Sequence, residues 1–281
     1  MAVQKMLSRG FELSGVGVHS GKPVRLAVLP KSEGGLVFRR TDLGGLEIAL
    51  GAGRFEAQNS TVIVADAFRI ATVEHLLAAL FAFGVGHAVI ALDADEIPIL
   101  DGSALPFVRA IEGAGTRALA APAAGFRIVR PFAVEDGGAS LVVEPPPAGD
   151  ALELTYGIEY AHPAIGTQVR SLTLDPEAFA RDVAPARTFG FLRDVEALRA
   201  RGLALGASFE NTVVLDADRV VSGPLRFPDE FVRHKLLDLA GDLALLGRPL
   251  AGRFTASKAG HRLHLEVVKF LLAHPEYTTP F

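Results

Sequence analysis

The 281-residue sequence contains no cysteine, which excludes a disulfide framework and any metal site built from thiolates. A metal ion in this protein would therefore be held by histidine and carboxylate side chains. No apolar run approaches the roughly 20 residues that a membrane-spanning helix needs, and the N-terminal segment lacks the apolar stretch of a signal peptide. The formal net charge of −4 gives no reason to expect binding to nucleic acid. These absences predict a cytoplasmic protein without an integral membrane segment.

The order of local sequence patterns indicates the fold class. With 49% hydrophobic and 21% charged residues, the chain has the composition of a folded globular protein. In each half, strand patterns come first and helix patterns follow, which favours α+β layers over a parallel βαβ series. We therefore predict two similar α+β domains, each a layered sandwich of sheet and helices, at residues 1–122 and 126–281. The small-residue stretch 118–125, which contains a proline, is the candidate linker.

Apolar patterns and turn residues place the individual elements. Strands are expected at residues 24–29, 87–93, 126–134, 140–144 and 152–160. Helices are expected at residues 71–83, 103–112 with Ser103 as N-cap, 176–182, 194–201, 229–246 and 260–273.

The helix expected at 229–246 carries the most informative pattern. His234 and Asp238 are four residues apart, so they share one helical face and can bind the same ion. Asp242 lies one turn further along this face. The many leucines between these residues indicate a buried helix, and buried polar side chains need partners. The alternative is a chance row of charges on an exposed helix.

A second expected helix places Glu74 directly before His75 among apolar residues. Neighbouring helical residues point about 100° apart, so the two side chains would line one cavity from different directions. His75 would then bind a metal ion, and Glu74 would stand away from the ion as a base. Two histidines, an aspartate and a free glutamate match a catalytic zinc site that keeps one open position for water. A purely structural Glu–His pair is the alternative.

Two further polar residues are candidates for stabilising an anionic intermediate. His261 follows Gly260 and begins the last expected helix, where free N–H groups and the positive end of the helix dipole favour negative charge. Thr188 follows Arg187 and precedes two phenylalanines, so its hydroxyl could donate a hydrogen bond to an oxyanion. The alternatives are a solvated helix cap for His261 and an ordinary turn for Thr188.

Seven segments, taken together and in order, resemble one family: the UDP-3-O-acyl-N-acetylglucosamine deacetylases, zinc amidases that commit Gram-negative bacteria to lipid A synthesis. The resemblance covers nearly the whole chain. It rests on residues 15–22 (GVGVHSGK), 72–80 (TVEHLLAAL), 96–103 (EIPILDGS), 186–191 (ARTFGF), 206–211 (GASFEN), 234–242 (HKLLDLAGD) and 258–261 (KAGH).

The resemblance implies two α+β domains with the active site between them and a single zinc ion. It implies the following site: zinc ligands His75, His234 and Asp238, general base Glu74, His261 as general acid or electrostatic partner, Asp242 orienting His261, Thr188 near the oxyanion, and Lys235 near the substrate. The implied partner is a small-molecule substrate, and we expect a monomer. Which of His261 and Glu74 protonates the leaving amine stays open.

The resemblance also implies an insert near residues 190–212 that forms a tunnel for the acyl chain. The expected tunnel residues are Val18, Phe189, Phe191, Leu192, Val195, Leu198, Leu205, Ala207 and Val214. Burying an acyl chain there would gain about 0.8 kcal/mol per methylene. Lys235 and Lys258 are candidates for contact with the diphosphate. Alternatively, the apolar residues form only the core of a small domain.

The expected reaction is hydrolysis of the N-acetyl group of UDP-3-O-acyl-N-acetylglucosamine, which releases acetate and the free amine. One alternative is a non-catalytic protein of the same fold that binds sugar nucleotides or acyl chains. Another is a hydrolase of a different amide, such as a peptidase, although the His-Glu-x-x-His helix common in those enzymes is absent. His19 is expected to anchor a turn. No catalytic role is expected for His264, and His87, His162 and His274 look incidental.

Overall fold

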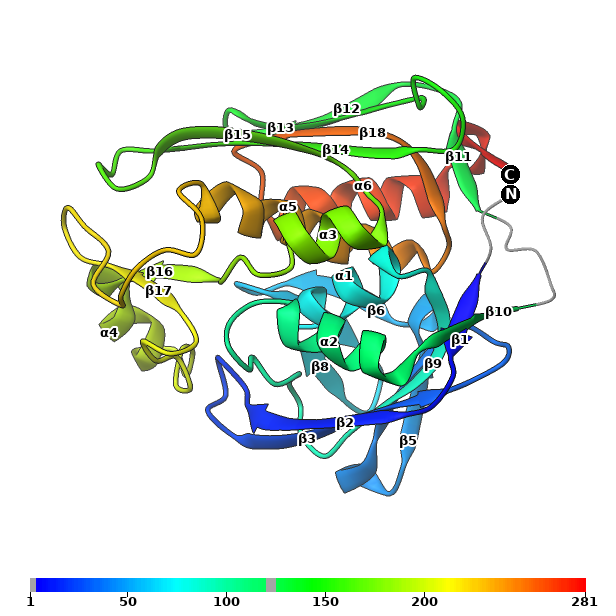
Figure 1. Cartoon of the computed structure of the whole chain (residues 1–281), viewed down its shortest axis with the longest axis horizontal. Helices are drawn as coiled ribbons and strands as arrows, with labels where there is room; N and C mark the ends of the chain where they lie inside the picture. Colours follow the sequence, from blue (N-terminus) through cyan, green and yellow to red (C-terminus); the bar gives the residue numbers. More distant parts are fainter. Residues whose placement is uncertain (1–3, 120–124) are drawn as a thin grey trace.

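The computed structural model describes residues 4–119 and 125–281. Two seven-stranded sheets form its outer layers, and helices fill the space between them (Figure 1). All strands of the first sheet precede residue 119 and all strands of the second follow residue 125, so each half of the chain builds one sheet. This arrangement confirms the α+β class. The predicted boundary at residue 122 and most of the predicted linker lie outside the described residues.

The first sheet is mixed, with the strand order β10-β1-β9-β3-β2, and β4 pairs with both β9 and β5. Its strands are β1 (Lys5–Leu7), β2 (Phe11–Val16), β3 (Pro23–Pro30), β4 (Leu36–Arg40), β5 (Leu46–Ala49), β9 (Val85–Leu92) and β10 (Thr116–Ala118). A separate antiparallel sheet comprises β6 (Arg54–Ala57), β7 (Thr61–Val64) and β8 (Arg69–Ala71).

The second sheet has the order β12-β13-β18-β11-β19, with β14 pairing β18 and β15. Its strands are β11 (Phe126–Ile128), β12 (Phe132–Asp136), β13 (Ala139–Glu144), β14 (Leu152–Tyr160), β15 (Gly166–Thr173), β18 (Leu250–Ser257) and β19 (Thr278–Pro280). The single strand expected at 126–134 is two strands, because Pro131 lies between them and cannot donate to a ladder. A small parallel pair, β16 (Phe189–Phe191) and β17 (Val213–Leu215), stands apart beside α4 (Figure 1).

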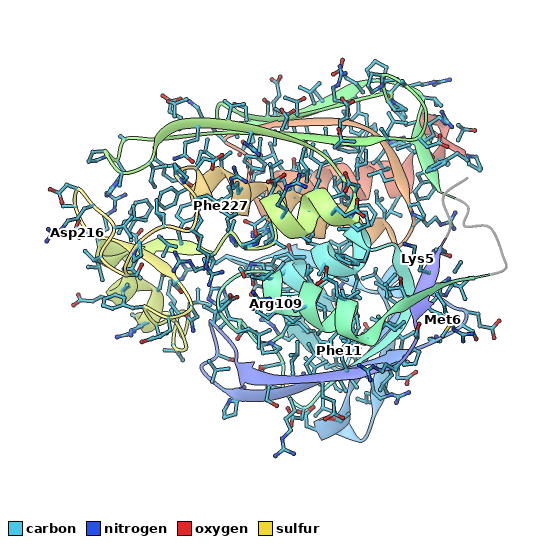
Figure 2. All side chains as sticks on the ribbon, in the orientation of Figure 1. Lys5, Met6, Phe11, Arg109, Asp216 and Phe227 are labelled. Atoms are coloured by element: carbon cyan, nitrogen blue, oxygen red, sulfur yellow. The ribbon has the colours of Figure 1, made fainter. Side chains whose placement is uncertain are left out.

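The helices are α1 (Glu74–Ala82), α2 (Leu105–Ala114), α3 (Pro176–Asp182), α4 (Leu192–Ala200), α5 (Glu230–Leu243) and α6 (His261–Ala273), with a 3-10 turn at Ala244–Leu246 after α5. Helices α1 and α2 lie against the first sheet, α5 and α6 lie against the second, and α1 packs on α5. Side chains fill the space between these layers (Figure 2). None of the helices in the described ranges is long and apolar enough to span a membrane.

Two helices begin later than expected, and the local backbone explains why. Ala71 belongs to β8, and Thr72 has a φ of 57°, which prevents α1 from starting before Glu74. Helix α2 begins at Leu105, two residues after Ser103, whose hydroxyl still accepts a hydrogen bond from the Leu105 amide at 3.2 Å. The late start of α1 puts Glu74 and His75 in the first turn of their helix, at the centre of the molecule.

Candidate active site

The residues with candidate catalytic roles meet where three helices converge. Helix α1 carries Glu74 and His75, α5 carries His234 and Asp238, and α6 begins with His261. The two halves of the chain therefore both contribute to one cluster. All of the first four side chains are buried.

A glycine in α5 allows the first turn of α1 to come this close. A Cβ atom at Gly241 would lie 2.1 Å from the backbone oxygen of Glu74, so only glycine permits this approach. The contact fixes the position of Glu74 and His75 relative to the preceding turn of α5, which carries Asp238. The Gly-Asp pair at 241–242, noted in the sequence as part of a motif, thus has a steric reason.

His75, His234 and Asp238 direct their ligand atoms toward one point. The Asp238 Oδ1 atom lies 3.3 Å from His234 Nε2 and 3.9 Å from His75 Nε2, and all three ligand atoms lie within 4.8 Å of one another. In a tetrahedral zinc site with ligands at about 2.0–2.2 Å, ligand atoms are separated by about 3.3–3.6 Å. The 3.3 Å separation matches that geometry, and the 3.9 Å separation is slightly longer.

The hydrogen bonding of His234 also fits a metal ligand. Its Nδ1 atom lies 3.1 Å from the carbonyl oxygen of Ala186, which can only accept, so Nδ1 carries the hydrogen. The lone pair of Nε2 is then left facing the Asp238 carboxylate, and a cation between them would satisfy both acceptors. Orientation of a ligand imidazole by a backbone carbonyl is usual in metal sites.

The charge states complete this donor set. Burial lowers the pKa of His75 to about 3, with a further contribution from His234, and burial also lowers the pKa of His234. Burial alone would raise the pKa of Asp238, but the neighbouring positive charge, that of Lys235 included, holds it well below its usual range. Two neutral imidazoles and a carboxylate at neutral pH are the form in which these groups bind Zn²⁺.

Glu74 faces the cluster without belonging to the ligand group. Its Oε2 atom accepts a hydrogen bond from the Thr61 amide at 3.1 Å, and its Oε1 atom lies 3.8 Å from His261 Nε2. Burial raises the pKa of Glu74 to about 8, against the opposing effect of His261. A carboxyl group with such a raised pKa in a cavity is a candidate for proton transfer.

His261 is held by Asp242, as the resemblance implies. His261 Nδ1 lies 2.7 Å from Asp242 Oδ2, and Nε2 points toward Glu74. Burial alone would lower the pKa of His261, but Asp242 raises it to about 9, so the imidazole is charged at neutral pH. Burial would raise the pKa of Asp242, but His261 keeps it below its ordinary value.

Two residues of this network were missed in the sequence. Thr61 on β7 donates its amide to Glu74 and its hydroxyl to Asp242. His264, for which no role was expected, lies 2.8 Å from Asp242 Oδ2 through Nδ1. The distances of Asp242 to both histidines are hydrogen-bond lengths, so this trio is a hydrogen-bonded group rather than a second metal site. Its only sequence signal was the i, i+3 spacing of His261 and His264.

Thr188 and Lys235 flank the metal-ligand group. The Lys235 ammonium donates to Asp238 Oδ2 at 2.9 Å and lies 5.7 Å from the centre of the Phe189 ring. Burial alone would lower the pKa of Lys235, but Asp238 raises it, so the side chain keeps its charge. Thr188 is anchored through its backbone: its amide donates to Gly102 and its carbonyl accepts from Val213, both at 2.8 Å.

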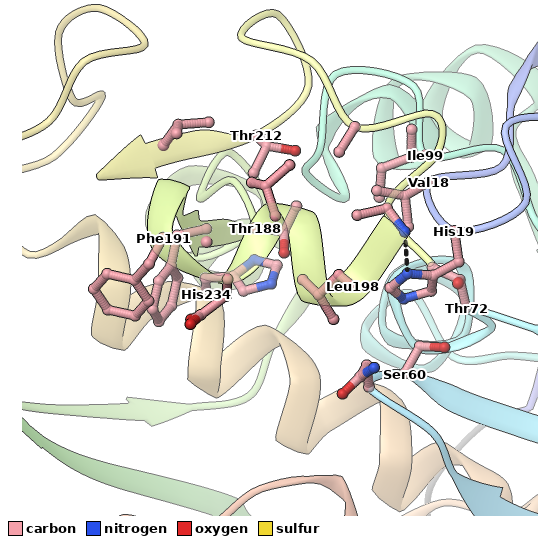
Figure 3. Close-up of a pocket in the computed structure, with 18 of the residues that line it drawn as sticks. Val18, His19, Ser60, Thr72, Ile99, Thr188, Phe191, Leu198, Thr212 and His234 are labelled. Atoms are coloured by element: carbon pink, nitrogen blue, oxygen red, sulfur yellow. Dashed lines mark hydrogen bonds between the residues drawn. The ribbon is translucent and has the colours of Figure 1, made fainter. Parts of the chain in front are cut away.

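A cavity of about 760 Å³ opens from this cluster toward helix α4 (Figure 3). In Figure 3, Leu198 lies between His234 on one side and His19 on the other. Eight of the expected tunnel residues line the cavity: Val18, Phe189, Phe191, Leu192, Val195, Leu198, Ala207 and Val214. The lining also includes residues that the sequence did not suggest: Ile99, Tyr160, Arg199, Arg201, Ala204, Phe209 and Thr212.

Leu205 and Lys258 are not among the lining residues. The Leu205 side chain is 51% exposed, and its backbone amide instead donates to the His19 carbonyl at 3.1 Å. Lys258 is paired with Glu159 at the surface. Alternating apolar residues in a loop do not reveal which of them face inward, which is why Leu205 was included in the expected tunnel.

The loop of residues 17–22 joins the first half of the chain to the insert. Glu96, which is buried, accepts hydrogen bonds from the His19 and Ser20 amides at 2.9 and 2.8 Å and from the Thr72 hydroxyl at 2.8 Å. His19 Nδ1 accepts from the Ala204 amide at 3.4 Å (Figure 3). His19 thus anchors a turn, as expected, and also borders the cavity.

Comparison with known proteins gives a consistent result. A family model described as UDP-3-O-acyl N-acetylglycosamine deacetylase matches residues 4–273. A protein named UDP-3-O-acyl-N-acetylglucosamine deacetylase from Phenylobacterium zucineum is 45% identical over 269 residues, which cover 94% of this chain and 91% of the relative. Proteins with the same name from Shewanella baltica (strain OS155) and Shewanella sp. (strain ANA-3) are each 42% identical over 284 residues, covering 98% of this chain and 92% of the relative.

Proposed function

Because the chain belongs to the UDP-3-O-acyl-N-acetylglucosamine deacetylase family, we propose that it hydrolyses the N-acetyl group of a UDP-3-O-acyl-N-acetylglucosamine in lipid A biosynthesis. The products are acetate and the free amine. The observation that carries the proposal is the convergence of His75, His234 and Asp238 on one point, with Glu74 and His261 facing them across a buried cluster.

The metal ion in this proposal is zinc, held by His75, His234 and Asp238. Bound there, zinc would supply Lewis acidity that polarises the amide carbonyl and makes an attacking water more acidic. The donor set of two neutral histidines and one carboxylate supports zinc, and the absence of cysteine in the sequence leaves no softer site to compete for it.

Glu74 acts as the general base in this mechanism. Its carboxyl group is buried and its pKa is raised to about 8, so its ionised form is a stronger base toward the attacking water than the carboxylate of an exposed glutamate. The Thr61 amide holds one carboxyl oxygen, which leaves the other directed toward His261. The base is therefore oriented before the substrate arrives.

His261 supplies positive charge and a proton near the leaving amine. Asp242 holds its Nδ1 and keeps the ring protonated, so Nε2 carries a hydrogen that can be donated. Because His261 Nε2 and Glu74 Oε1 are 3.8 Å apart, either group can return a proton to the amine once Glu74 has been protonated. The Thr188 hydroxyl is proposed to donate to the oxyanion.

The acyl chain is proposed to occupy the cavity beside α4. The apolar residues of its lining include Leu198 and Val214, and each methylene buried against them would contribute about 0.8 kcal/mol. Lys235, whose charge is retained beside Asp238, is proposed to contact the polar part of the substrate. The proposed diphosphate contact of Lys258 would require that residue to leave its pair with Glu159.

Metal content and deacetylation measured on one preparation, before and after treatment with a chelator, test this function. We expect one tightly bound zinc per chain, activity on UDP-3-O-acyl-N-acetylglucosamine, loss of that activity on chelation, and its return with zinc. Activity that survives complete metal removal would refute the metal-dependent mechanism. A zinc-loaded protein that does not act on this substrate would refute the proposed reaction.

The non-catalytic alternative is not favoured, because the base, the three candidate ligands and His261 are all in place. Protein that binds the substrate stoichiometrically without turnover in the same assay would revive this alternative. The cytoplasmic location and the monomeric state stay predictions.

A further inference from the structure

Asp242 is a buried carboxylate surrounded by three side-chain donors. The Thr61 hydroxyl donates to its Oδ1 atom, while His261 and His264 lie 2.7 and 2.8 Å from its Oδ2 atom, each through Nδ1. Asp242 is 0% exposed, so these donors take the place of water. A buried charge needs such partners, and the loss of any one of them leaves an unsatisfied acceptor.

His264 differs from His261 in its surroundings. It lies one turn further along α6 on the same face, is 0% exposed, and does not border the cavity, whereas His261 does. Burial lowers the pKa of His264, so the ring is neutral at neutral pH. Because the Asp242 carboxylate only accepts, the single ring hydrogen is on Nδ1.

The far side of the His264 ring is held by packing against Tyr156, because the single hydrogen of the Tyr156 hydroxyl goes to a backbone carbonyl. The His264 Nε2 atom lies 3.2 Å from the Tyr156 hydroxyl, and the two rings meet edge to face with centres 5.8 Å apart. The same hydroxyl donates to the Ala259 carbonyl at 2.6 Å, just before the first turn of α6. Tyr156 on β14 therefore connects the second sheet to the start of the helix that carries both histidines.

We propose that His264 is a positioning residue of the deacetylase reaction, holding Asp242 in the orientation that aims His261 Nε2 at the leaving amine. Without His264, the only side-chain donor on Asp242 Oδ2 in the described part of the chain would be His261, the residue that has to be positioned. His264 supplies an independent donor on that oxygen and so holds it in place. This inference rests on the proposed function.

Two substitutions at this position separate hydrogen bonding from packing. In His264→Asn, the side-chain N–H can take the place of the Nδ1 hydrogen, whereas His264→Leu fills similar space without a donor. His87→Asn is a matched control, because His87 on β9 also uses both ring nitrogens, toward the Gly35 amide and the Gln4 side chain, but does not border the cavity.

We expect His264→Leu to lower kcat by about 10- to 100-fold, as is typical when a group that orients a reactive residue is lost, with KM changed by less than about twofold. His264→Asn should recover most of this loss, and His87→Asn should match the parent protein. Zinc content should be the same in all variants, since His264 contacts none of the proposed ligands. The inference is overturned if the two His264 variants have the same kcat, whether that value equals the parent's or falls equally below it.

Proton NMR supplies a readout that does not depend on turnover or on bound metal. The Nδ1 hydrogens of His261 and His264 are held against a buried carboxylate and should give imidazole N–H resonances in slow exchange with solvent. His264→Leu should remove one resonance and speed the exchange of the other, whereas His264→Asn should leave the His261 resonance slow. An unchanged His261 resonance in His264→Leu would overturn the inference. If the parent protein is inert on the substrate, the proposed function fails, and this measurement still decides whether His264 orders His261.

Discussion

Gly241→Ala directly tests whether the contact between α1 and α5 places the catalytic groups. The added Cβ would lie 2.1 Å from the Glu74 backbone oxygen, whereas real Cβ atoms essentially never come within 3.0 Å of another group, so the helices must separate by about 0.9 Å. Overpacking of this kind costs about 3 kcal/mol when backbone must move, and the better helix propensity of alanine returns about 1 kcal/mol. The net expectation is a loss of about 2 kcal/mol in the free energy of unfolding.

For 281 residues, the entropy of unfolding is about 0.6 kcal/mol/K, so this loss lowers Tm by about 3 °C. The effect on activity should be larger, because a displacement of about 1 Å at a catalytic group costs roughly 100-fold in rate. Thermal unfolding and kcat/KM for deacetylation measure the two effects on the same variant.

The matched control is Gly113→Ala in α2, where a Cβ would meet no atom within 4 Å. This variant should gain about 1 kcal/mol from helix propensity and keep full activity. A Gly241→Ala protein that unfolds at or above the parent Tm with full activity would refute the reasoning. It would mean that α1 and α5 accommodate a Cβ atom at this position without moving apart.

Three further predictions concern single carboxylates. Glu74→Ala should lower kcat by about 10²- to 10⁴-fold while the bound metal is retained; the parent rate in this variant would mean that the base is another group. Asp238→Ala removes one of three proposed ligands, so its metal content by elemental analysis should fall well below one ion per chain, and full occupancy would contradict the ligand set. Asp42→Asn should lower stability by about 0.5–1 kcal/mol at pH 7 by removing the ion pair with Arg40, whose Nη2 lies 2.7 Å from Asp42. The hydrogen bond from Arg40 lowers the pKa of Asp42 in the folded state, so this contribution is fully present above the unfolded pKa of about 3.9 and disappears as the pH falls through the folded value. Tm measured from pH 7 to pH 2.5 should therefore converge for the parent and the variant, and a constant difference would contradict the assignment.

Local patterns in the sequence were enough to predict the elements that carry most of the site. The leucines around His234 and Asp238 identified α5 as a buried helix, and the i, i+4 spacing placed both side chains on one face, which the structure bears out. The i, i+4 spacing and burial are properties of one segment, so they can be read without knowledge of the partners. The α+β class followed in the same way from the order of strands and helices.

Residues whose role depends on distant partners could not be found in this way. Thr61 bonds to Asp242 across 181 positions, and its segment is a short β-branched strand with no polar signature of its own. No catalytic role was expected for His264, and only the packing of α6 on α5 reveals its carboxylate partner. The positive φ of Thr72 could not be predicted from the sequence either, since threonine rarely adopts that conformation. Its hydroxyl is held by Glu96, a residue 24 positions away.

The same packing explains how the protein keeps several acceptor atoms pointed at one place. His234 Nε2 and Asp238 Oδ1 are both acceptors, yet they lie 3.3 Å apart in a buried setting where mutual repulsion is poorly screened. Hydrogen bonds restrict the rotation of both side chains: the Ala186 carbonyl holds the His234 imidazole, and Lys235 holds the other oxygen of Asp238. The backbone of α5 and these two anchors thus maintain an arrangement that the electrostatics of the pair alone would oppose, and the packing of α1 on α5 adds His75 to it. A cation bound at this point would relieve the repulsion. Because His75 comes from the first half of the chain, the binding energy of the cation would also stabilise the contact between the two halves.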